Sequence, residues 1–280
     1  MKKAYLIFLL MSILFSTKAQ TFLDSVRSGK ISMELYTKAF NELDPIDKSI
    51  IGFKENGKWG FKKTNGEILI NPKYDFVSDF QHGVVIVKTN SKEGLINTSD
   101  SVIIYFGKYD DIYDFKDNRA RVKKDNYFGI IDQNGNEILP CEYISADNYR
   151  FHLCQLSNKN KKEGIVDLNG KIIIPFIYDK LIQMQLEGVI KGKRNGKWGY
   201  INYRGEDLIK FEYDFIDQPV NGMIAVKKDK KFGFINTHGE EIIPCIYDTV
   251  YSFSEMGKAS IIKNGKAGYV LKDGTEKIFK

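Results

Sequence analysis

One glycine recurs along most of the chain at an almost constant interval, and this repetition constrains the fold more than any other feature. Successive copies stand 34 or 35 residues apart, at Gly60, Gly94, Gly129, Gly164, Gly199, Gly233 and Gly268. A period of this length is typical of solenoids, propellers and similar arrays, in which each repeat is one small supersecondary unit. We therefore predict a repeat domain over residues 48–280, built from seven tandem units of about 35 residues.

Other positions keep the same register. The residue before the glycine is aromatic in four units, at Trp59, Phe128, Trp198 and Phe232, and is Glu93, Glu163 or Ala267 in the others. A second glycine follows six residues later at Gly66, Gly135, Gly170, Gly205, Gly239 and Gly274, and Asp100 replaces it in one unit. A tyrosine comes fourteen or fifteen residues after the first glycine, at Tyr74, Tyr109, Tyr143, Tyr178, Tyr213 and Tyr247. Asp75, Asp110, Asp179, Asp214 and Asp248 come next, with Ile144 as the exception.

Each unit reads as a three-stranded β-meander. The first strand is apolar, as in Val84–Lys88, and a tight turn such as Asn56-Gly57 follows it. Asn-Gly between apolar runs is a strong hairpin signal, because both residues tolerate positive φ. The second strand carries the recurring glycine. A proline ends the third strand at Pro72, Pro140, Pro175 or Pro244, which suits an edge because proline cannot donate a ladder hydrogen bond.

Apolar residues occupy two consecutive positions after the glycine, as in Ile130-Ile131. Such neighbours point to opposite faces of a strand, so both faces of the sheet should be buried between adjacent units. The glycine should allow a neighbouring backbone or ring to approach closely, and Trp59 and Trp198 should lie in the core. We predict an all-β fold, and we favour a propeller-like closed ring over an open β-solenoid, since radial repetition leaves only short, protected edges.

The chain begins with a pattern typical of a secretory signal peptide. Lys2 and Lys3 precede a mostly apolar stretch over residues 4–15, and Thr17 and Ala19 supply small residues before a cleavage point. This stretch is shorter than the ~20 residues that a membrane-spanning helix needs. We expect residues 1–19 to be removed, which leaves a mature chain that is periplasmic, on the cell surface or secreted, without a transmembrane segment.

Residues 20–47 have a different periodicity. Apolar residues recur there at roughly helical spacing, at Phe22, Val26, Ile31, Leu35, Ala39 and Leu43. This spacing predicts a short helical lead-in. Asp44-Pro45 ends it, because the residue before a proline is driven out of the α region.

The repeats also resemble a known family. Gly57-Lys58-Trp59-Gly60-Phe61 and Gly196-Lys197-Trp198-Gly199-Tyr200-Ile201 are followed by segments such as Ile173-Ile174-Pro175-Phe176-Ile177-Tyr178-Asp179. This pattern is similar to that of the bacterial WG-repeat family, and the resemblance extends from about Ile50 to the C-terminus. It implies a structural unit and no particular substrate.

The hairpins between first and second strands are rich in basic residues. These are Lys123, Lys124, Lys159, Lys161, Lys162, Lys191, Lys193, Arg194, Lys197, Lys227, Lys228, Lys230 and Lys231. They could bind an anionic partner or simply keep the hairpins soluble and unpaired. Cleavage lowers the formal charge from +6 to +3, because residues 1–19 contain three lysines and no acidic residue. This mild charge makes nucleic acid an improbable partner.

Residues that could carry chemistry are few and scattered. His82, His152 and His238 occupy different repeat positions and suit turns, and no metal-spaced cluster, phosphate loop or nucleophile elbow is present. Cys141, Cys154 and Cys245 are expected to be small apolar residues rather than a disulfide framework. The recurrent aspartates could form a cation-binding ring, but aspartates after strands commonly cap turns.

Two functions from different classes remain open. The preferred one is a non-enzymatic binding or scaffolding module at the cell envelope or outside the cell, without a cofactor, whose partner is an envelope protein or a glycan. The alternative is an exported hydrolase or lyase with a site in a groove or channel formed by several repeats. A functional position is expected to break the repeat, whereas five equivalent Asp residues argue for structure.

Overall fold

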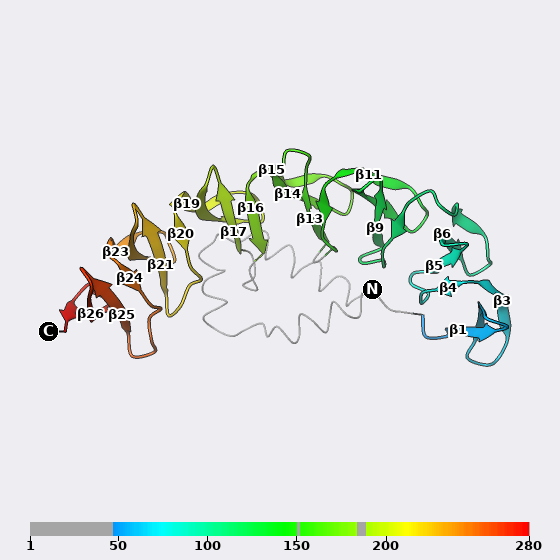
Figure 1. Cartoon of the computed structure of the whole chain (residues 1–280), viewed down its shortest axis with the longest axis horizontal. Coiled ribbons are helices and arrows are strands. Elements are labelled where there is room, and N and C mark those ends of the chain that lie inside the picture. Colours follow the sequence, from blue (N-terminus) through cyan, green and yellow to red (C-terminus); the bar gives the residue numbers. More distant parts are fainter. Residues whose placement is uncertain (1–46, 150–151, 184–188, 280) are drawn as a thin grey trace, which may run out of the picture. The chain divides into compact units, whose positions relative to one another are not determined.

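The computed structural model describes residues 47–149, 152–183 and 189–279. The predicted signal peptide, residues 1–19, lies outside these ranges, and so does the helical lead-in of residues 20–47 except for Asp47. Every regular element in the described residues is a β-strand, which confirms the all-β prediction (Figure 1). The chain forms two compact units, and the boundary between them follows Phe176.

The compact unit that ends at Phe176 begins with a three-stranded antiparallel sheet, β1 (Ile50–Glu55), β2 (Lys58–Lys63) and β3 (Ile68–Tyr74). The second sheet is β4 (Phe76–Val77), β5 (Val84–Thr89), β6 (Lys92–Asn97) and β7 (Val102–Ile104). The third is β8 (Asp111–Ile112), β9 (Arg119–Lys124), β10 (Tyr127–Asp132) and β11 (Glu137–Tyr143). The fourth is β12 (Ser145–Ala146), β13 (Leu153–Ser157), β14 (Glu163–Asp167) and β15 (Ile172–Tyr178), and the unit boundary falls within β15.

The compact unit that begins at Ile177 repeats this pattern. The fifth sheet is β16 (Lys180–Gln183), β17 (Val189–Arg194), β18 (Lys197–Asn202) and β19 (Asp207–Tyr213). The sixth is β20 (Phe215–Ile216), β21 (Met223–Lys228), β22 (Lys231–Asn236) and β23 (Glu241–Tyr247). The seventh is β24 (Thr249–Val250), β25 (Lys258–Lys263), β26 (Lys266–Leu271) and β27 (Glu276–Ile278). Each of the seven recurring glycines thus has a sheet of its own.

Six of these sheets have four strands, so the prediction of three strands per unit was wrong for them. The additional strand follows the Tyr-Asp pair and forms one edge of the next sheet. In β4, for example, Phe76 pairs with Lys88 and Val77 pairs with Val87 of β5. The chain therefore passes from one sheet to the next at Tyr-Asp. A strand of two residues is too short to show the alternation that reveals strands in a sequence.

The third strand does not end at its proline. Pro72 lies inside β3, and Pro175 lies inside β15. The pairing of β2 with β3 shifts beside the proline, because Trp59 pairs with Tyr74 while Phe61 pairs with Ile70. This bulge lets the strand continue past a residue that cannot donate a ladder bond. The predicted edge position of the third strand is confirmed, since β3 and β15 each end the strand order of their sheet.

The recurring glycine faces this bulge. A Cβ atom on Gly60 would lie 2.4 Å from the carbonyl oxygen of Ile70 and 2.6 Å from the nitrogen of Pro72. On Gly199 it would lie 2.6 Å from the carbonyl oxygen of Ile209. A backbone therefore approaches the glycine closely, as predicted, but it is the third strand of the same sheet and not part of a stacked neighbour.

The turns also follow the sequence closely. Asn56 and Gly57 have φ values of 49° and 80°, so both take the left-handed conformation expected of a two-residue hairpin turn. The second repeat glycine also has positive φ, as at Gly66 with 95°. Asp100, which replaces it in one unit, adopts the same region with φ 62°; aspartate tolerates this conformation better than most residues.

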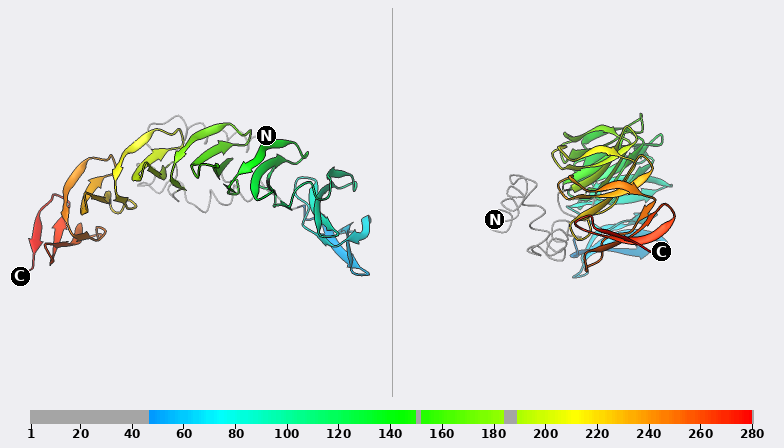
Figure 2. Two further views of the ribbon diagram at one scale, coloured as in Figure 1. Left: turned by 45° about the horizontal axis from the view of Figure 1, so that its top comes forward. Right: turned by 90° about the vertical axis from the view of Figure 1, so that its left-hand side faces the viewer.

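Both faces of an internal sheet are buried, as predicted. In β6, Leu95 and Ile96 are each 0% exposed. Leu95 packs with Val122 and Ile131 of the third sheet, whereas Ile96 packs with Phe61 of the first. Figure 2 shows successive sheets of this unit face to face. Each such side chain contributes roughly 1.5 to 3 kcal/mol on burial, so neighbouring sheets stabilise one another.

The described residues include no helix that is both long enough and apolar enough to span a bilayer. The closed ring remains a prediction, as does its alternative, the open β-solenoid.

Candidate binding site

The Tyr-Asp junctions join the hairpins of successive sheets. The carboxylate of Asp75 accepts hydrogen bonds from Lys58 Nζ at 2.5 Å, in the first sheet, and from the N–H of Asn90 at 2.7 Å, in the second. Asp248 likewise accepts from Lys231 Nζ and from the N–H of Gly265 at 3.0 Å. The aspartate therefore holds a lysine of one hairpin and the turn of the next.

Other junctions keep one or the other of these contacts. Asp110 accepts from the N–H of Asp125 at 2.8 Å, and Asp179 accepts from the N–H of Gly196 at 2.8 Å. Asp214 accepts from Lys197 Nζ at 2.5 Å. The hydrogen bond from the lysine is the main reason that the pKa of Asp75, Asp214 and Asp248 lies below its usual value. These carboxylates are engaged as turn and ion-pair partners, which fits the structural interpretation of the recurrent aspartates.

The tyrosine of the junction is usually buried. Tyr74, Tyr109, Tyr178, Tyr213 and Tyr247 are 1–5% exposed. Burial raises the pKa of Tyr109 and of Tyr213 to about 12. A tyrosine in this position is therefore a protonated core residue at neutral pH.

The third junction, Tyr143-Ile144 between the third and fourth sheets, departs from this pattern at three points. Ile144, which is 38% exposed, takes the aspartate position. Tyr127, also exposed, takes the position of the pairing lysine, which is Lys58, Lys197 or Lys231 elsewhere. The connection from β13 to β14 runs from Asn158 to Lys162 and is one residue longer than the stretch from Arg194 to Lys197 at the same place in the fifth sheet. The ion pair and the two-residue turn are lost together.

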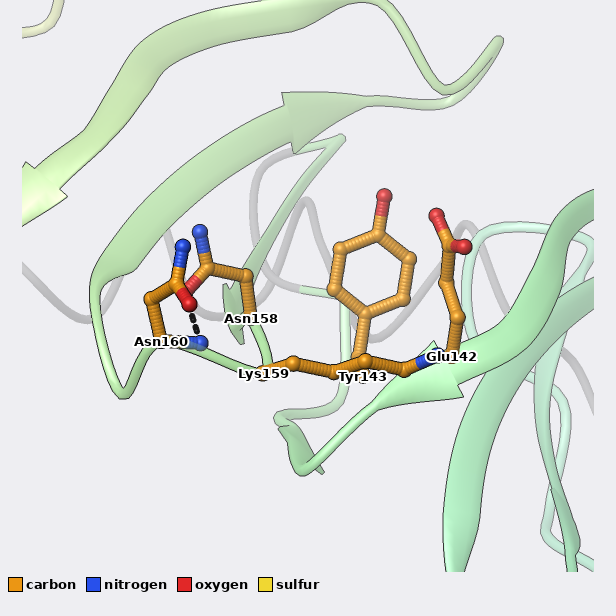
Figure 3. A pocket seen from close by; sticks show the side chains of 5 residues that line it. All are labelled: Glu142, Tyr143, Asn158, Lys159 and Asn160. Atoms are coloured by element: carbon orange, nitrogen blue, oxygen red, sulfur yellow. Dashed lines mark hydrogen bonds between the residues drawn. The ribbon is translucent and has the colours of Figure 1, made fainter.

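A hollow of about 200 Å³ lies at this junction. Its lining residues come from the end of β11 and from the long connection, and they are Glu142, Tyr143, Asn158, Lys159 and Asn160. Figure 3 shows that the carboxylate of Glu142, the hydroxyl of Tyr143 and the amide groups of both asparagines point to the same side. Tyr143 is only half-buried, unlike the tyrosines of the other junctions.

The connection is held in place by its own hydrogen bonds. Oδ1 of Asn158 accepts from the N–H of Asn160 and the N–H of Lys162, both at 3.0 Å. The N–H of Lys161 donates to the carbonyl oxygen of Asn158 at 2.9 Å. The oxygen of the Asn158 side chain is thus used in the turn, and its amide nitrogen is left to face the hollow as a donor.

The charges at the hollow balance. Glu142 supplies one negative charge and Lys159 one positive charge, and Lys159 Nζ lies 5.1 Å from the ring centroid of Tyr127. Burial, followed by the nearby carboxylate of Glu142, raises the pKa of Tyr143, so its hydroxyl can donate a hydrogen bond at neutral pH. The hollow therefore offers donors and one charged acceptor beside an aromatic ring.

A second hollow of about 220 Å³ lies at the regular junction between the fifth and sixth sheets. Its acidic residues are engaged, because Asp207 lies 2.7 Å from Arg194 Nη2 and Glu212 lies 2.8 Å from Lys228 Nζ. Its lining also includes His238, in the turn with Gly239. This hollow keeps the repeat pattern and its ion pairs.

Several basic residues of the hairpins form ion pairs within the protein. Lys197, Lys228 and Lys231 form ion pairs with Asp214, Glu212 and Asp248. These ion pairs leave the hairpins with less unpaired positive charge for an anionic ligand than the sequence suggests.

Other hairpin lysines lie over aromatic rings. Lys191 Nζ lies 4.9 Å and Lys193 Nζ 5.6 Å from the ring centroid of Trp198, and Lys227 Nζ lies 4.9 Å from that of Phe232. Trp198 is half-buried beneath Lys191 and Lys193, and Trp59 is half-buried beneath Lys54. The prediction that both tryptophans lie in the core is therefore only partly right.

The aromatic position usually has a lysine as its cross-strand partner. Lys193 pairs with Trp198, and Lys227 pairs with Phe232. Where Glu93 replaces the aromatic residue, its carboxylate lies 3.1 Å from Nζ of the partner Lys88. In the seventh sheet both partners are uncharged, Ile262 and Ala267. The second and seventh repeats, which lack the aromatic residue, therefore keep a compatible cross-strand pair.

The remaining candidate residues have structural positions. His82 and His152 have φ values of 52° and 61° in turns, as expected of turn histidines. Cys154 is buried, whereas Cys141 and Cys245 are half-buried beside the core, and burial raises the pKa of all three thiols. Within residues 47–149, 152–183 and 189–279, no three His, Cys, Asp or Glu side chains are arranged to hold a metal ion.

Comparisons with solved structures find weak likenesses. The alignment with a eukaryotic initiation factor covers 84% of this chain and 74% of that chain, at 8% identity and a TM-score of 0.36. Hsv2 of Kluyveromyces lactis matches over 85% and 98% of the two chains, at 8% identity and a TM-score of 0.33. BamB from Moraxella catarrhalis matches over 82% and 79%, at 15% identity and a TM-score of 0.31.

Sequence comparison gives a firmer result. No curated protein matches the chain. The family described as WG containing repeat matches six segments, residues 59–92, 94–128, 128–150, 164–198, 198–232 and 232–266. Five of these segments run roughly from one recurring glycine to the next, the third stops at residue 150, and together they cover most of the chain. The protein therefore belongs to the family of WG containing repeat proteins.

Proposed function

We propose that this protein is a non-enzymatic binding or scaffolding module that acts at the cell envelope or outside the cell. The observation that carries the proposal is the third junction, where the repeat is interrupted and polar side chains surround a hollow. Repeat positions that serve only structure are conserved between units, so a break in several of them at one place supports a binding role.

The alternative, an exported hydrolase or lyase, needs an acid and a base at one site. The repeated Asp and Tyr residues fit this role poorly. Asp75 and Asp248 accept hydrogen bonds from lysines and turn amides, and Tyr74 and Tyr247 are buried with raised pKa values. These contacts favour the binding module over the enzyme.

Binding should be tested with the mature chain, residues 20–280, on glycan, lipid-headgroup and protein arrays. A matched variant replaces residues 158–162 with the Arg-Asn-Gly-Lys of the fifth-sheet hairpin, which restores a regular turn. We expect a ligand that the parent chain retains and the variant loses. Hydrolysis of an array compound by the parent chain would favour the enzyme instead.

Export rests on the charged, apolar and small-residue segments of residues 1–19. We expect the protein recovered from outside the cytoplasm to begin at Gln20, and intact mass or N-terminal sequencing measures this directly. A chain that still carries Met1 in the envelope fraction would contradict the signal peptide.

A further inference from the structure

The size and polarity of the third-junction hollow indicate its ligand. A volume of about 200 Å³ is small for a drug-sized molecule, since such sites usually span ~300 to 1,000 Å³. It suits one ring-sized group. The hollow is open to solvent along the hairpin, so the rest of a longer ligand can extend away from it.

The hydrogen-bonding groups point to hydroxyls. Asn158 and Asn160 present amide nitrogens as donors, Tyr143 presents a protonated hydroxyl, and Glu142 presents a carboxylate that only accepts. A ligand hydroxyl both donates and accepts, so a polyhydroxylated ring can satisfy all of these groups at once. A purely anionic group cannot, because it has no proton to donate to Glu142.

The charge at the hollow argues in the same direction. Glu142 and Lys159 bring opposite charges to the lining, so their sum favours neither an anion nor a cation. A phosphate or sulfate would meet the carboxylate of Glu142, and an ammonium group would meet Lys159. An uncharged ligand avoids both repulsions.

We infer that the third-junction hollow binds one uncharged sugar unit of a glycan. This inference rests on the proposed binding function and names its ligand class. The half-buried ring of Tyr143 gives the apolar face of the sugar a surface to cover, while its hydroxyls meet Glu142, Asn158 and Asn160. Lys159, which also lines the hollow, lies over the ring of Tyr127.

The test is calorimetric titration of the mature chain with soluble neutral oligosaccharides, namely a β-glucan oligomer, a chitin oligomer and a malto-oligosaccharide. A polygalacturonate oligomer and inorganic phosphate serve as anionic probes. We expect at least one neutral oligomer to bind with an affinity that changes little between low and high salt. The anionic probes should bind more weakly or not at all.

Two variants and one control locate the site. Glu142→Gln, which replaces a charged acceptor with a neutral amide, and Asn160→Ala, which removes a donor, should each weaken neutral-oligomer binding by about ten-fold. Glu212→Gln is the matched control, because Glu212 precedes Tyr213 as Glu142 precedes Tyr143 but is paired with Lys228. It should leave binding unchanged, and thermal unfolding should show that all three variants fold.

The outcomes separate the inference from the proposed function. If a peptide or an anionic probe binds and is lost in Glu142→Gln and Asn160→Ala, the sugar inference is wrong and the binding function stands. If neutral oligomers bind equally to all variants, the hollow is not their site. If none of the oligosaccharides or array compounds binds, the proposed function fails as well.

Discussion

At the residue scale, close packing explains why glycine recurs at one position of every repeat. Its missing side chain makes room for the third strand, whose backbone would lie 2.3–3.1 Å from an added Cβ in all seven copies. Real Cβ atoms do not approach backbone atoms at the short end of this range. The glycine is therefore required by the edge strand of its own sheet, and the glycine and this close third strand form one structural device.

Replacing Gly199 with Ala tests this device. The new methyl would meet the carbonyl oxygen of Ile209 at 2.6 Å, so the third strand must shift. We expect unfolding to become easier by ~1 to 3 kcal/mol or more, the usual cost of overpacking. Gly52→Ala is the control, because its methyl would find ordinary contacts beginning at 3.4 Å. Urea midpoints measure both, and equal effects would contradict the close-approach argument.

The junction aspartates should make stability depend on pH. The pKa of Asp248 is lowered in the folded protein, first by Lys231 and then by the N–H of Gly265, from an ordinary value of 3.8. Such a group stabilises the fold above its unfolded pKa, and this contribution is lost as the pH falls through the lower, folded pKa. Asp248→Asn should therefore destabilise the protein at pH 7 and lose most of that effect well below pH 3.8.

Denaturant titrations at several pH values measure the difference between this variant and the parent chain. Asp79→Asn, at an exposed residue outside the Tyr-Asp positions, is the control and should give a smaller difference at pH 7. A constant difference for Asp248→Asn across the whole range would show that its carboxylate charge is unimportant.

At the scale of the strand and sheet, much of the architecture could be predicted because the signals are local. Asn-Gly turns, paired apolar residues and the strand glycine each carry their own physical reason. The two-residue edge strands could not be predicted in this way, since Phe76-Val77 has no periodicity of its own. The proline was misread because a bulge in the partner pairing, invisible in one strand, lets the strand continue past it.

The candidate site was only partly visible in the sequence. Ile144 stood out as the exception among the aspartates. It indicates a site only together with Tyr127 and the longer connection that begins at Asn158. These segments become neighbours only when successive hairpins are stacked. Comparing the residue after each tyrosine with the residue two before each glycine would have shown that the acid and the lysine disappear together.

The half-buried Trp198 of the fifth sheet should contribute less to stability than the fully buried Phe234 of the sixth. Phe234 is 1% exposed and packs against Phe253 with ring centroids 4.8 Å apart, so Phe234→Ala should cost ~3 to 5 kcal/mol. Trp198→Ala should cost clearly less, because the ring is half-exposed beneath Lys191 and Lys193. Thermal or urea unfolding ranks the two, and the reverse order would place Trp198 in the core after all.

At the scale of the whole molecule, ring closure is the prediction with the clearest measurement. A compact chain of this length after removal of residues 1–19 has a radius of gyration of about 18 Å. We expect small-angle scattering of the mature protein to give a value close to this, as a closed ring would. A clearly larger radius with an elongated distance distribution would favour the open β-solenoid.

The locality of the sheets also affects how the chain reaches its fold. Within β5 to β6 or β21 to β22, partners are separated by only a two-residue turn, so little chain entropy is lost on closing each hairpin. Proteins dominated by such short-range pairings fold faster than most all-β proteins, whose strands come from distant segments. Hairpins can therefore form one by one as the polypeptide emerges during synthesis, each new sheet docking on its predecessor, and a stretch that has just left the ribosome need not wait for the C-terminus.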